Sequence, residues 1–347
     1  MIIRFADKNE LATWNHAILA NPDGGNVFQS LEYSNLKKRG NWRPVFLIAD
    51  NIAFSVLEKN IIGFGKVWYI MKGPGVSTPK ELQMILKPLQ IFAKKHGVFT
   101  VKIEPEILKT ETSLEAMSKL DLVKTNPIQP NISTVALDIS PSLEAIMTNM
   151  PQKGRYAIKR AERDGVTVKR MSATDENCRI MFDLLQETAA DSQFGIRASS
   201  YYMSYWQTFA KEKLGQLFFA YVEGAVVAGA YAFIYGKKST YKDGASIRKR
   251  TAYGASHLLQ WHIITWAKEH GSLWHDLCGS PPADRIKDPT HPHYGIGLFK
   301  TQFNKEVTEY VGAYDIPIVG WKYKIWHHFL EKLIRKVYYK IKHESYY

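Results

Sequence analysis

The chain has 347 residues, of which 45% are hydrophobic, 13% aromatic and 23% charged, and this composition excludes a largely disordered protein. No stretch has the length and apolarity of a membrane span, and the first residues, MIIRFADKNE, lack the apolar core of a secretory signal. Cys178 and Cys278 are too few for a disulfide scaffold or a multi-cysteine metal site, so we expect a cytoplasmic protein. At about 150 residues per domain, the length favours two domains.

Lysine and arginine total 46 against 33 acidic residues, a formal net charge of +13. Two segments hold much of the excess, because residues 153–170 and residues 321–347 each carry seven basic and two acidic side chains. Such charge favours an anionic partner: nucleic acid, a phosphorylated metabolite or lipid headgroups. On charge alone, a basic protein that is simply soluble is the alternative.

Helices and strands are predicted to alternate along the first half of the chain. Helical spacing predicts helices over residues 11–20 and 79–96, and apolar runs bounded by turns predict strands over residues 43–49, 52–58, 66–71 and 99–104. The first two strands form a hairpin turned at Asp50 and Asn51. Thr78 is the N-cap of the second helix, and Pro79 is its first residue.

The second half repeats this pattern after a proline-containing segment, residues 126–131. We predict strands over residues 134–138, 166–170, 217–222, 225–235, 238–244 and 273–277, and helices over residues 141–150, 154–164, 173–191, 200–213 and 252–270. The order helix, meander, helix, strand therefore occurs in residues 11–99 and again in residues 173–277. The pattern predicts two similar α/β domains.

No glycine-rich loop of the P-loop or dinucleotide type follows any predicted strand. Residues 250–255, RTAYGA, resemble the pyrophosphate-binding turn of acyl-CoA acetyltransferases, but their glycine spacing differs by one residue. We favour the interpretation that Gly254 and Ala255 are small residues at a helix entry.

Several longer stretches carry a resemblance to one family. They are KGRYAIKRAERDGV (153–166), FGIRASSYY (194–202), YKDGASIRKRTAYGASHLLQWHIITWAKEHG (241–271), DLCGSPP (276–282) and HPHYGIGLFKTQFNKEVTEYVGAYDIPI (291–318), with VFQSLEYSNLKKRGNWRP (27–44), KGPG (72–75) and VKIEPE (101–106) in the first half. Together they resemble the FemABX family of non-ribosomal peptidyltransferases.

The resemblance implies an α/β fold of two tandem acetyltransferase-like (GNAT-type) domains, with mixed, mostly antiparallel sheets flanked by helices. The first domain would comprise residues 1–144 plus 312–347, ending in a basic helix, and the second residues 145–311. Long heptad repeats are absent from the sequence, so the chain resembles the compact form without a coiled-coil arm.

The implied activity is the transfer of an amino acid from aminoacyl-tRNA to the stem-peptide amine of a peptidoglycan precursor. The acceptor would be a UDP-linked or a lipid-linked muramyl peptide, and we expect a monomer with no cofactor. One alternative is an acyl-CoA-dependent N-acyltransferase of the same fold. Another is a non-catalytic protein that binds RNA or membranes.

The resemblance also assigns the catalytic candidates. Lys300, preceded by Phe299, matches a family Phe–Lys pair whose lysine faces the ester and the terminal adenosine of the tRNA. A positioned cation of this kind stabilises the oxyanion. Glu104 matches a family carboxylate at a strand end and is a candidate acceptor for the proton of the amine. The alternative for Lys300 is an ordinary surface lysine.

The acceptor carries a diphosphate, which needs fixed cations. By resemblance, Lys37 and Arg197 are its two phosphate ligands, with the adjacent Lys38 as the alternative to Lys37. Tyr201 lies one helical turn beyond Arg197 and can donate to the same acceptor. Phe99 stands where a related protein has a tyrosine that contacts the acceptor. For Arg197 the alternative is a salt-bridged residue at a helix start.

Two basic segments have predicted roles of their own. Lys153, Arg155, Lys159 and Arg160 are candidate contacts to tRNA phosphates, with a solvated helix as the alternative. Residues 321–341 alternate apolar and basic side chains at helical spacing, which predicts peripheral contact with an anionic membrane or, alternatively, packing on the first domain. The histidine spacing predicts no metal site.

Overall fold

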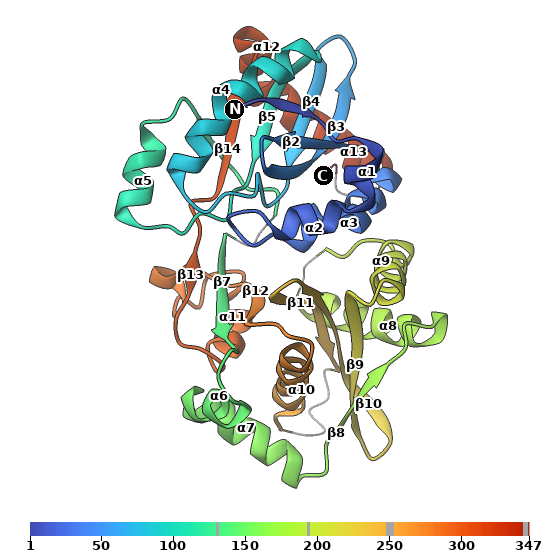
Figure 1. The fold of residues 1–347 in the computed structure, drawn as a ribbon. Helices are drawn as coiled ribbons and strands as arrows, with labels where there is room; N and C mark the ends of the chain where they lie inside the picture. The colour runs from blue at the N-terminus through green and yellow to red at the C-terminus, as the bar shows by residue number, and fades with distance from the viewer. Residues whose placement is uncertain (130–131, 193–194, 248–252, 343–345, 347) are drawn as a thin grey trace. The chain divides into compact units, whose positions relative to one another are not determined.

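The computed structural model describes residues 1–129, 132–192, 195–247, 253–342 and 346 (Figure 1). It divides into two compact units, residues 1–132 with 309–347 and residues 133–308. The sequence analysis expected these boundaries at residues 144 and 312. β7 (Ser133–Asp138) belongs to the second unit, because it pairs with β12 (Trp274–Gly279).

A seven-stranded sheet forms the centre of the first unit, in the order β1-β2-β3-β4-β5-β14-β6. Its strands are β1 (Ile3–Phe5), β2 (Arg43–Ala49), β3 (Ile52–Ile61), β4 (Gly65–Ile70), β5 (Val98–Ile103), β6 (Val123–Thr125) and β14 (Ala313–Pro317). All neighbours run antiparallel except β4 and β5. In Figure 1, β14 near the end of the chain lies beside β5, far from it in sequence.

Helices surround this sheet: α1 (Lys8–Ala12), α2 (Trp14–Leu19), α3 (Leu31–Leu36), α4 (Pro79–Lys95), α5 (Glu111–Ser118), α12 (Gly320–Ile325) and α13 (Glu331–Lys342), with a π-helical turn η4 (Trp326–Leu330) joining the last two. The α4 helix makes the parallel crossover from β4 to β5. Thr78 is its N-cap, as the sequence predicts, and the structure adds a capping box between Thr78 and Glu81. Its buried row (Leu82, Ile85, Leu86, Leu89 and Ala93) packs in the core of the unit.

The second unit contains an equivalent sheet, in the order β13-β7-β12-β11-β10-β9-β8. The further strands are β8 (Thr167–Met171), β9 (Gly215–Val222), β10 (Ala225–Tyr235), β11 (Lys238–Ser246) and β13 (Thr308–Glu309). Its helices are α6 (Leu143–Asn149), α7 (Gln152–Arg163), α8 (Asp175–Ser192), α9 (Ser199–Lys211), α10 (Ala255–Glu269) and α11 (Tyr294–Lys300).

The two sheets have the same connectivity. In each, four antiparallel strands are followed by one parallel neighbour reached through a long helix, α4 in the first unit and α10 in the second. The sixth strand comes from a distant part of the chain: β14 in the first sheet and β7 in the second. The predicted fold class of two α/β units with mixed, mostly antiparallel sheets flanked by helices is confirmed.

The parallel pairs differ in length. β4 and β5 pair from Lys66 to Ile70, with a register shift between Lys66 and Val67, whereas β11 and β12 pair over only three positions, ending at Thr240 opposite Asp276. Beyond that point β12 has a bulge, with Cys278 in the left-handed region at a φ of 61°. The backbone carbonyl groups of the bulge must therefore accept hydrogen bonds from groups other than those of a neighbouring strand.

Gly254 starts α10 and allows it to approach α7 closely. Its φ is 81°, and a Cβ placed there would lie 2.1 Å from the carbonyl oxygen of Ala157. No other residue type fits this position without moving α7. The helix-entry interpretation of Gly254 therefore has a physical reason in the fold, while residues 250–252 of the same turn lie outside the described residues.

Candidate active site

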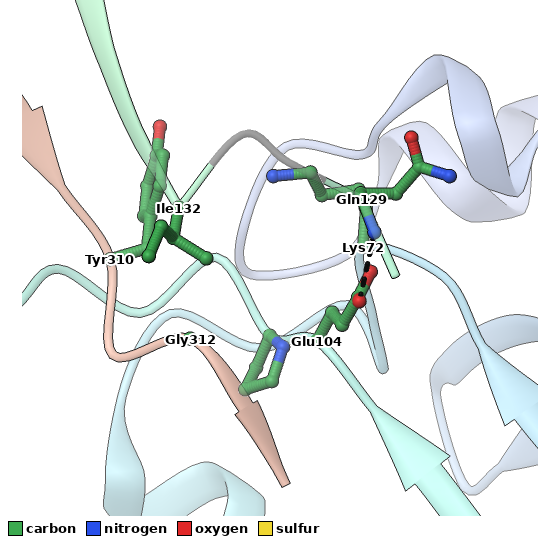
Figure 2. Close-up of a pocket in the computed structure, with 7 residues that line it drawn as sticks. Lys72, Glu104, Gln129, Ile132, Tyr310 and Gly312 are labelled. Carbon is green, nitrogen blue, oxygen red and sulfur yellow. Dashed lines mark hydrogen bonds between the residues drawn. The ribbon is translucent and has the colours of Figure 1, made fainter. Parts of the chain in front are cut away.

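Loops from four strands meet at one end of the first sheet. The parallel strands β4 and β5 both end there. Because β14 runs antiparallel to β5 and to β6, the start of β14 and the end of β6 lie at the same end of the sheet. These loops line a pocket with about 220 Å³ of empty space, part of it open to solvent (Figure 2). The lining residues are Lys72, Glu104, Pro105, Gln129, Ile132, Tyr310 and Gly312.

Glu104 lines this pocket and is 5% exposed. One of its carboxylate oxygens accepts a hydrogen bond from the Tyr69 hydroxyl at 2.6 Å, and the other accepts from the backbone amide of Ile128. That second oxygen also accepts from the backbone amide of Gln129 at 3.1 Å (Figure 2). Burial, reinforced by the neighbouring carboxylate, raises the pKa of Tyr69 well above 10.0. The carboxylate therefore anchors the loop after β6, in addition to lining the pocket.

Lys72 brings a cation into the pocket from the turn after β4. Its side chain is buried, and Nζ lies 3.5 Å from Glu106 Oε1 and 5.3 Å from the centroid of the Tyr310 ring. The second Glu106 oxygen accepts from Asn26 Nδ2 at 2.8 Å. The sequence motif KGPG contains Lys72, but the turn signal alone did not indicate that its first residue is a buried cation.

Lys37 lies in the same unit, at the C-terminal end of α3, and is 6% exposed. Its Nζ is 5.5 Å from the centroid of the Tyr33 ring. Tyr33 is close enough to Tyr69 to contribute to the raised pKa of that hydroxyl. Lys37 is therefore connected through two tyrosines to Glu104, although it is not one of the residues that line the pocket.

Phe99 occupies a different environment. It lies on β5 with 1% of its surface exposed, and its ring packs against Phe64 and Trp326 at centroid distances of 5.9 and 5.6 Å. A ligand could reach this ring only by displacing Trp326 of the C-terminal helix. We therefore leave Phe99 out of the acceptor site proposed below.

Lys300, in the second unit, ends α11 and is 6% exposed. Its Nζ donates to the carbonyl oxygens of Cys278 and Gly279 at 3.0 and 2.7 Å, which are groups of the β12 bulge. Burial lowers its pKa from 10.5, and the nearby Cys278 and Asp276 oppose that shift. A buried lysine fixed by two carbonyls is not the ordinary surface lysine of the alternative interpretation.

The bulge is itself held by polar contacts. Asp276 Oδ1 accepts the Cys278 amide at 2.7 Å and also the Thr134 hydroxyl, which in turn is 2.9 Å from the Cys278 carbonyl oxygen. On α11, Phe299 packs against His257 and Phe303 at ring distances of 4.9 and 5.4 Å. Phe299 therefore anchors the helix that carries Lys300.

Arg197 and Tyr201 form a stacked pair at the start of α9, with the guanidinium carbon 4.6 Å from the ring centroid. Arg197 also lies near Lys242, whose pKa is lowered by burial and by that arginine and raised by Cys278. Lys242 lies on β11 two residues beyond the last position that pairs with β12, and Lys300 binds the carbonyls of the β12 bulge, so both lysines lie at the open end of the β11–β12 pair.

Asp243 adds a carboxylate to this cluster. Its Oδ1 lies 3.5 Å from Lys242 Nζ, and its Oδ2 accepts from the Trp206 indole at 3.1 Å. Burial raises its pKa to about 8. The sequence analysis quoted YKDGAS for its resemblance but assigned no role to Lys242 or Asp243. The alternation of residue types along β11 could not indicate that this strand stops pairing with β12 after Thr240.

The four candidate tRNA contacts on α7 separate into two kinds. Arg155 donates to the carbonyl oxygens of Thr148 and Met150, and Arg160 is paired with Asp164 at 2.7 Å, so both serve the local structure. Lys153 and Lys159 are exposed. Tyr156 of this helix and Tyr253 are half-exposed, and their rings lie 6.1 Å apart.

Within the described ranges, no group of three or more His, Cys, Asp or Glu side chains is placed to hold a metal ion. In that same part of the chain, no helix has the length and apolarity needed to cross a membrane.

Comparison with protein families and relatives gives a consistent match. The model of the FemAB family matches residues 9–126, 120–225 and 219–332. A lipid II:glycine glycyltransferase of Staphylococcus saprophyticus is 20% identical over 341 residues, which cover 77% of this chain and 80% of that relative. The protein of the same name from Staphylococcus epidermidis is 31% identical over 93 residues, 27% of this chain and 22% of the relative.

Solved structures share the fold. The crystal structure of FemX matches with a TM-score of 0.80 at 17% identity, covering 95% of this chain and all of that one. L-PGS from Bacillus licheniformis matches with a TM-score of 0.54 at 14% identity, covering 95% of this chain and 97% of that one. At these identities the likeness concerns the arrangement of helices and strands.

The pocket cation should be important for stability as well as for binding. Lys72→Met leaves Glu106 buried without its ion-pair partner, and we expect a loss of about 3 kcal/mol in the free energy of unfolding. Lys119→Met is the matched control, because its ion pair with Glu115 is exposed on both sides and should contribute below about 1 kcal/mol. Urea denaturation of the two variants measures their losses in the free energy of unfolding. Equal losses would contradict a stabilising role for the buried Lys72–Glu106 ion pair.

Proposed function

Because the chain belongs to the FemAB family, we propose that it transfers an aminoacyl group from aminoacyl-tRNA to the stem-peptide amine of a lipid-linked peptidoglycan precursor. The observation that carries the proposal is the alignment with the S. saprophyticus lipid II:glycine glycyltransferase, which extends over most of both chains. The ranges matched by the family model, residues 9–126, 120–225 and 219–332, include the pocket residues, the β12 bulge and Lys300. The tRNA donor is the part of the proposal that rests on the family resemblance.

The proposed acceptor contacts are Lys37, Lys72 and Arg197. Each cation is held by aromatic or ionic neighbours of its own unit, so its charge has a defined position there before a ligand binds. Preorganised cations bind a diphosphate with less loss of side-chain entropy than mobile surface lysines. Tyr201, stacked under Arg197, orients the guanidinium.

The reaction replaces one acyl bond by another. The amine nitrogen attacks the ester carbonyl carbon, a C–N bond forms, and the carbonyl oxygen becomes an oxyanion. When that intermediate collapses, the C–O bond to the ribose breaks, and the ribose oxygen takes the proton that the amine gives up. We assign Lys300 to the oxyanion, because a protonated lysine has three donors and two of them are used by the bulge carbonyls.

Glu104 has a positioning role in this proposal. Its two oxygens already accept from one hydroxyl and two backbone amides, which leaves limited capacity to take a proton from the amine. The ribose oxygen can accept that proton directly, so the mechanism needs no protein base.

The alternative of an acyl-CoA-dependent N-acyltransferase rests on the turn at residues 250–255. Its described glycine, Gly254, is required by the close approach of α10 to α7, so it is no evidence for a pyrophosphate site.

A transfer assay decides between these functions. The protein is incubated with a lipid-linked muramyl peptide and either radiolabelled aminoacyl-tRNA or labelled acetyl-CoA. We expect label on the peptide from a charged tRNA and none from acetyl-CoA. A panel of charged tRNAs then identifies the amino acid. Label transfer from acetyl-CoA alone would contradict the proposal, and no transfer from any charged tRNA or from acetyl-CoA would leave only the binding alternative.

The pH dependence tests the role of Lys300. Its pKa is lowered by burial, so its charge is lost as the pH rises through a value below 10.5, and the wild-type turnover should decline on that alkaline side. Lys300→Arg stays charged and should lack this decline, at a lower rate because its geometry differs. Lys300→Ala should lose roughly 10²–10³ in turnover at every pH.

Turnover is measured at saturating acceptor and corrected for the folded fraction, since Lys300 also holds the bulge. If the lysine were purely structural, Lys300→Ala would lower the melting temperature while leaving corrected turnover near wild type. An identical decline of turnover at alkaline pH in the wild type and in Lys300→Arg would also contradict a role for the charge of Lys300 in the reaction.

A further inference from the structure

The C-terminal helical segment has two apolar faces. One face packs on the first unit, where Tyr323 is 6% exposed and donates to Asp315 Oδ2 at 3.1 Å. Trp326, 1% exposed, lies against Phe99 on the same side. The packing that the sequence analysis offered as an alternative to membrane contact is therefore present, but it uses only part of the apolar residues.

The other face points away from the unit. It consists of Trp321, Ile325, Phe329, Leu333, Val337 and Ile341, each between 43% and 67% exposed. We call these six residues the outer row. They recur every fourth residue, whereas an α-helix advances roughly 40° beyond a full turn in four residues. The wider π-helical turn η4 in the middle of the segment reduces this drift, and all six side chains are exposed.

A second element extends the same surface. Ile62, at the tip of the β3–β4 hairpin, is 94% exposed. The hairpin is attached to the start of α12, because Lys322 Nζ donates to the Phe64 carbonyl oxygen at 2.6 Å and the Phe64 and Trp321 rings lie 6.3 Å apart. The outer row thus continues to the tip of the β3–β4 hairpin, where the side chain of Ile62 is almost fully exposed.

Basic residues surround this apolar surface. Lys324, Lys332, Arg335, Lys336 and Lys340 are all exposed. The single acidic residue between Gly320 and Lys342 is Glu331, which is 8% exposed and directed inward. The exposed charge of the segment therefore has one sign.

We propose that the outer row, together with Ile62, docks the protein on an anionic lipid bilayer. A bilayer surface takes up separated apolar side chains between its headgroups while its phosphates pair with the flanking lysines. A protein interface would favour a contiguous patch depleted of lysine, and nucleic acid would make little use of six exposed apolar side chains. The docking requires none of the catalytic assignments above, so it is tested without substrate.

The experiment is vesicle co-sedimentation of the full chain. One set of vesicles contains phosphatidylcholine alone, and the other contains phosphatidylcholine with phosphatidylglycerol. We expect the wild type to bind the anionic vesicles at least 10-fold more tightly than the neutral ones. Phe329→Ser/Leu333→Ser should weaken that binding at least 10-fold. Lys332→Gln/Lys336→Gln should weaken it and reduce its dependence on salt.

The matched control is Met84→Ser/Ile91→Ser, which removes two exposed apolar side chains from α4 of the same unit, 50% and 62% exposed. It should bind like the wild type. Equal binding of Phe329→Ser/Leu333→Ser and wild type, or no binding of the wild type to anionic vesicles at low salt, would overturn the proposal. So would a dimer in analytical ultracentrifugation that the same double variant abolishes, because a second copy would then cover the row.

Discussion

The buried ion pair between Lys102 and Asp315 connects the strands and the C-terminal helix of the first unit, and both the pocket and the outer row depend on this connection. Nζ and Oδ1 are 2.7 Å apart, and the two side chains are 4% and 3% exposed. Lys102 also donates to Thr125 Oγ1 at 3.1 Å, and the other Asp315 oxygen accepts from the Tyr323 hydroxyl. One pair of charges thus connects β5, β6, β14 and α12. Burial raises the pKa of Asp315, and Lys102 opposes that rise.

The location of this pair explains why the pocket and the C-terminal helix occur in the same unit. Glu104, two residues after Lys102, directly follows the end of β5 and lines the pocket, and Gly312, three residues before Asp315, lines it too. Eight residues after Asp315, Tyr323 turns the inner face of α12 toward the sheet and leaves the outer row exposed. Because breaking one partner of a buried pair costs about 3–5 kcal/mol, the register of β14 is strongly specified. The geometry of the pocket and the position of the C-terminal helix therefore both depend on the Lys102–Asp315 ion pair.

Local signals in the sequence predicted much of this fold. Thr78, Pro79 and Glu81 determine the start of α4 without help from the rest of the chain, and the apolar run of β10 is bounded by turns on both sides. Residues 313–317 were different, since a short strand containing a buried aspartate has no pattern of its own until Lys102 is beside it. The same holds for Lys72 and Lys242, whose environments are created by strand ends that meet only in the folded sheet. The helical spacing of the tail could not show that its apolar residues serve two faces.

Hydrogen–deuterium exchange of Asp315→Asn tests the shared anchor most directly. The substitution keeps the shape of the side chain and leaves Lys102 buried beside a neutral amide. The account predicts faster exchange, together, in residues 100–106, 310–317 and 320–330, with residues 133–308 unchanged as the internal control for a folded protein. Faster exchange confined to residues 310–317, with the end of β5 and the C-terminal helix as protected as in the wild type, would contradict it.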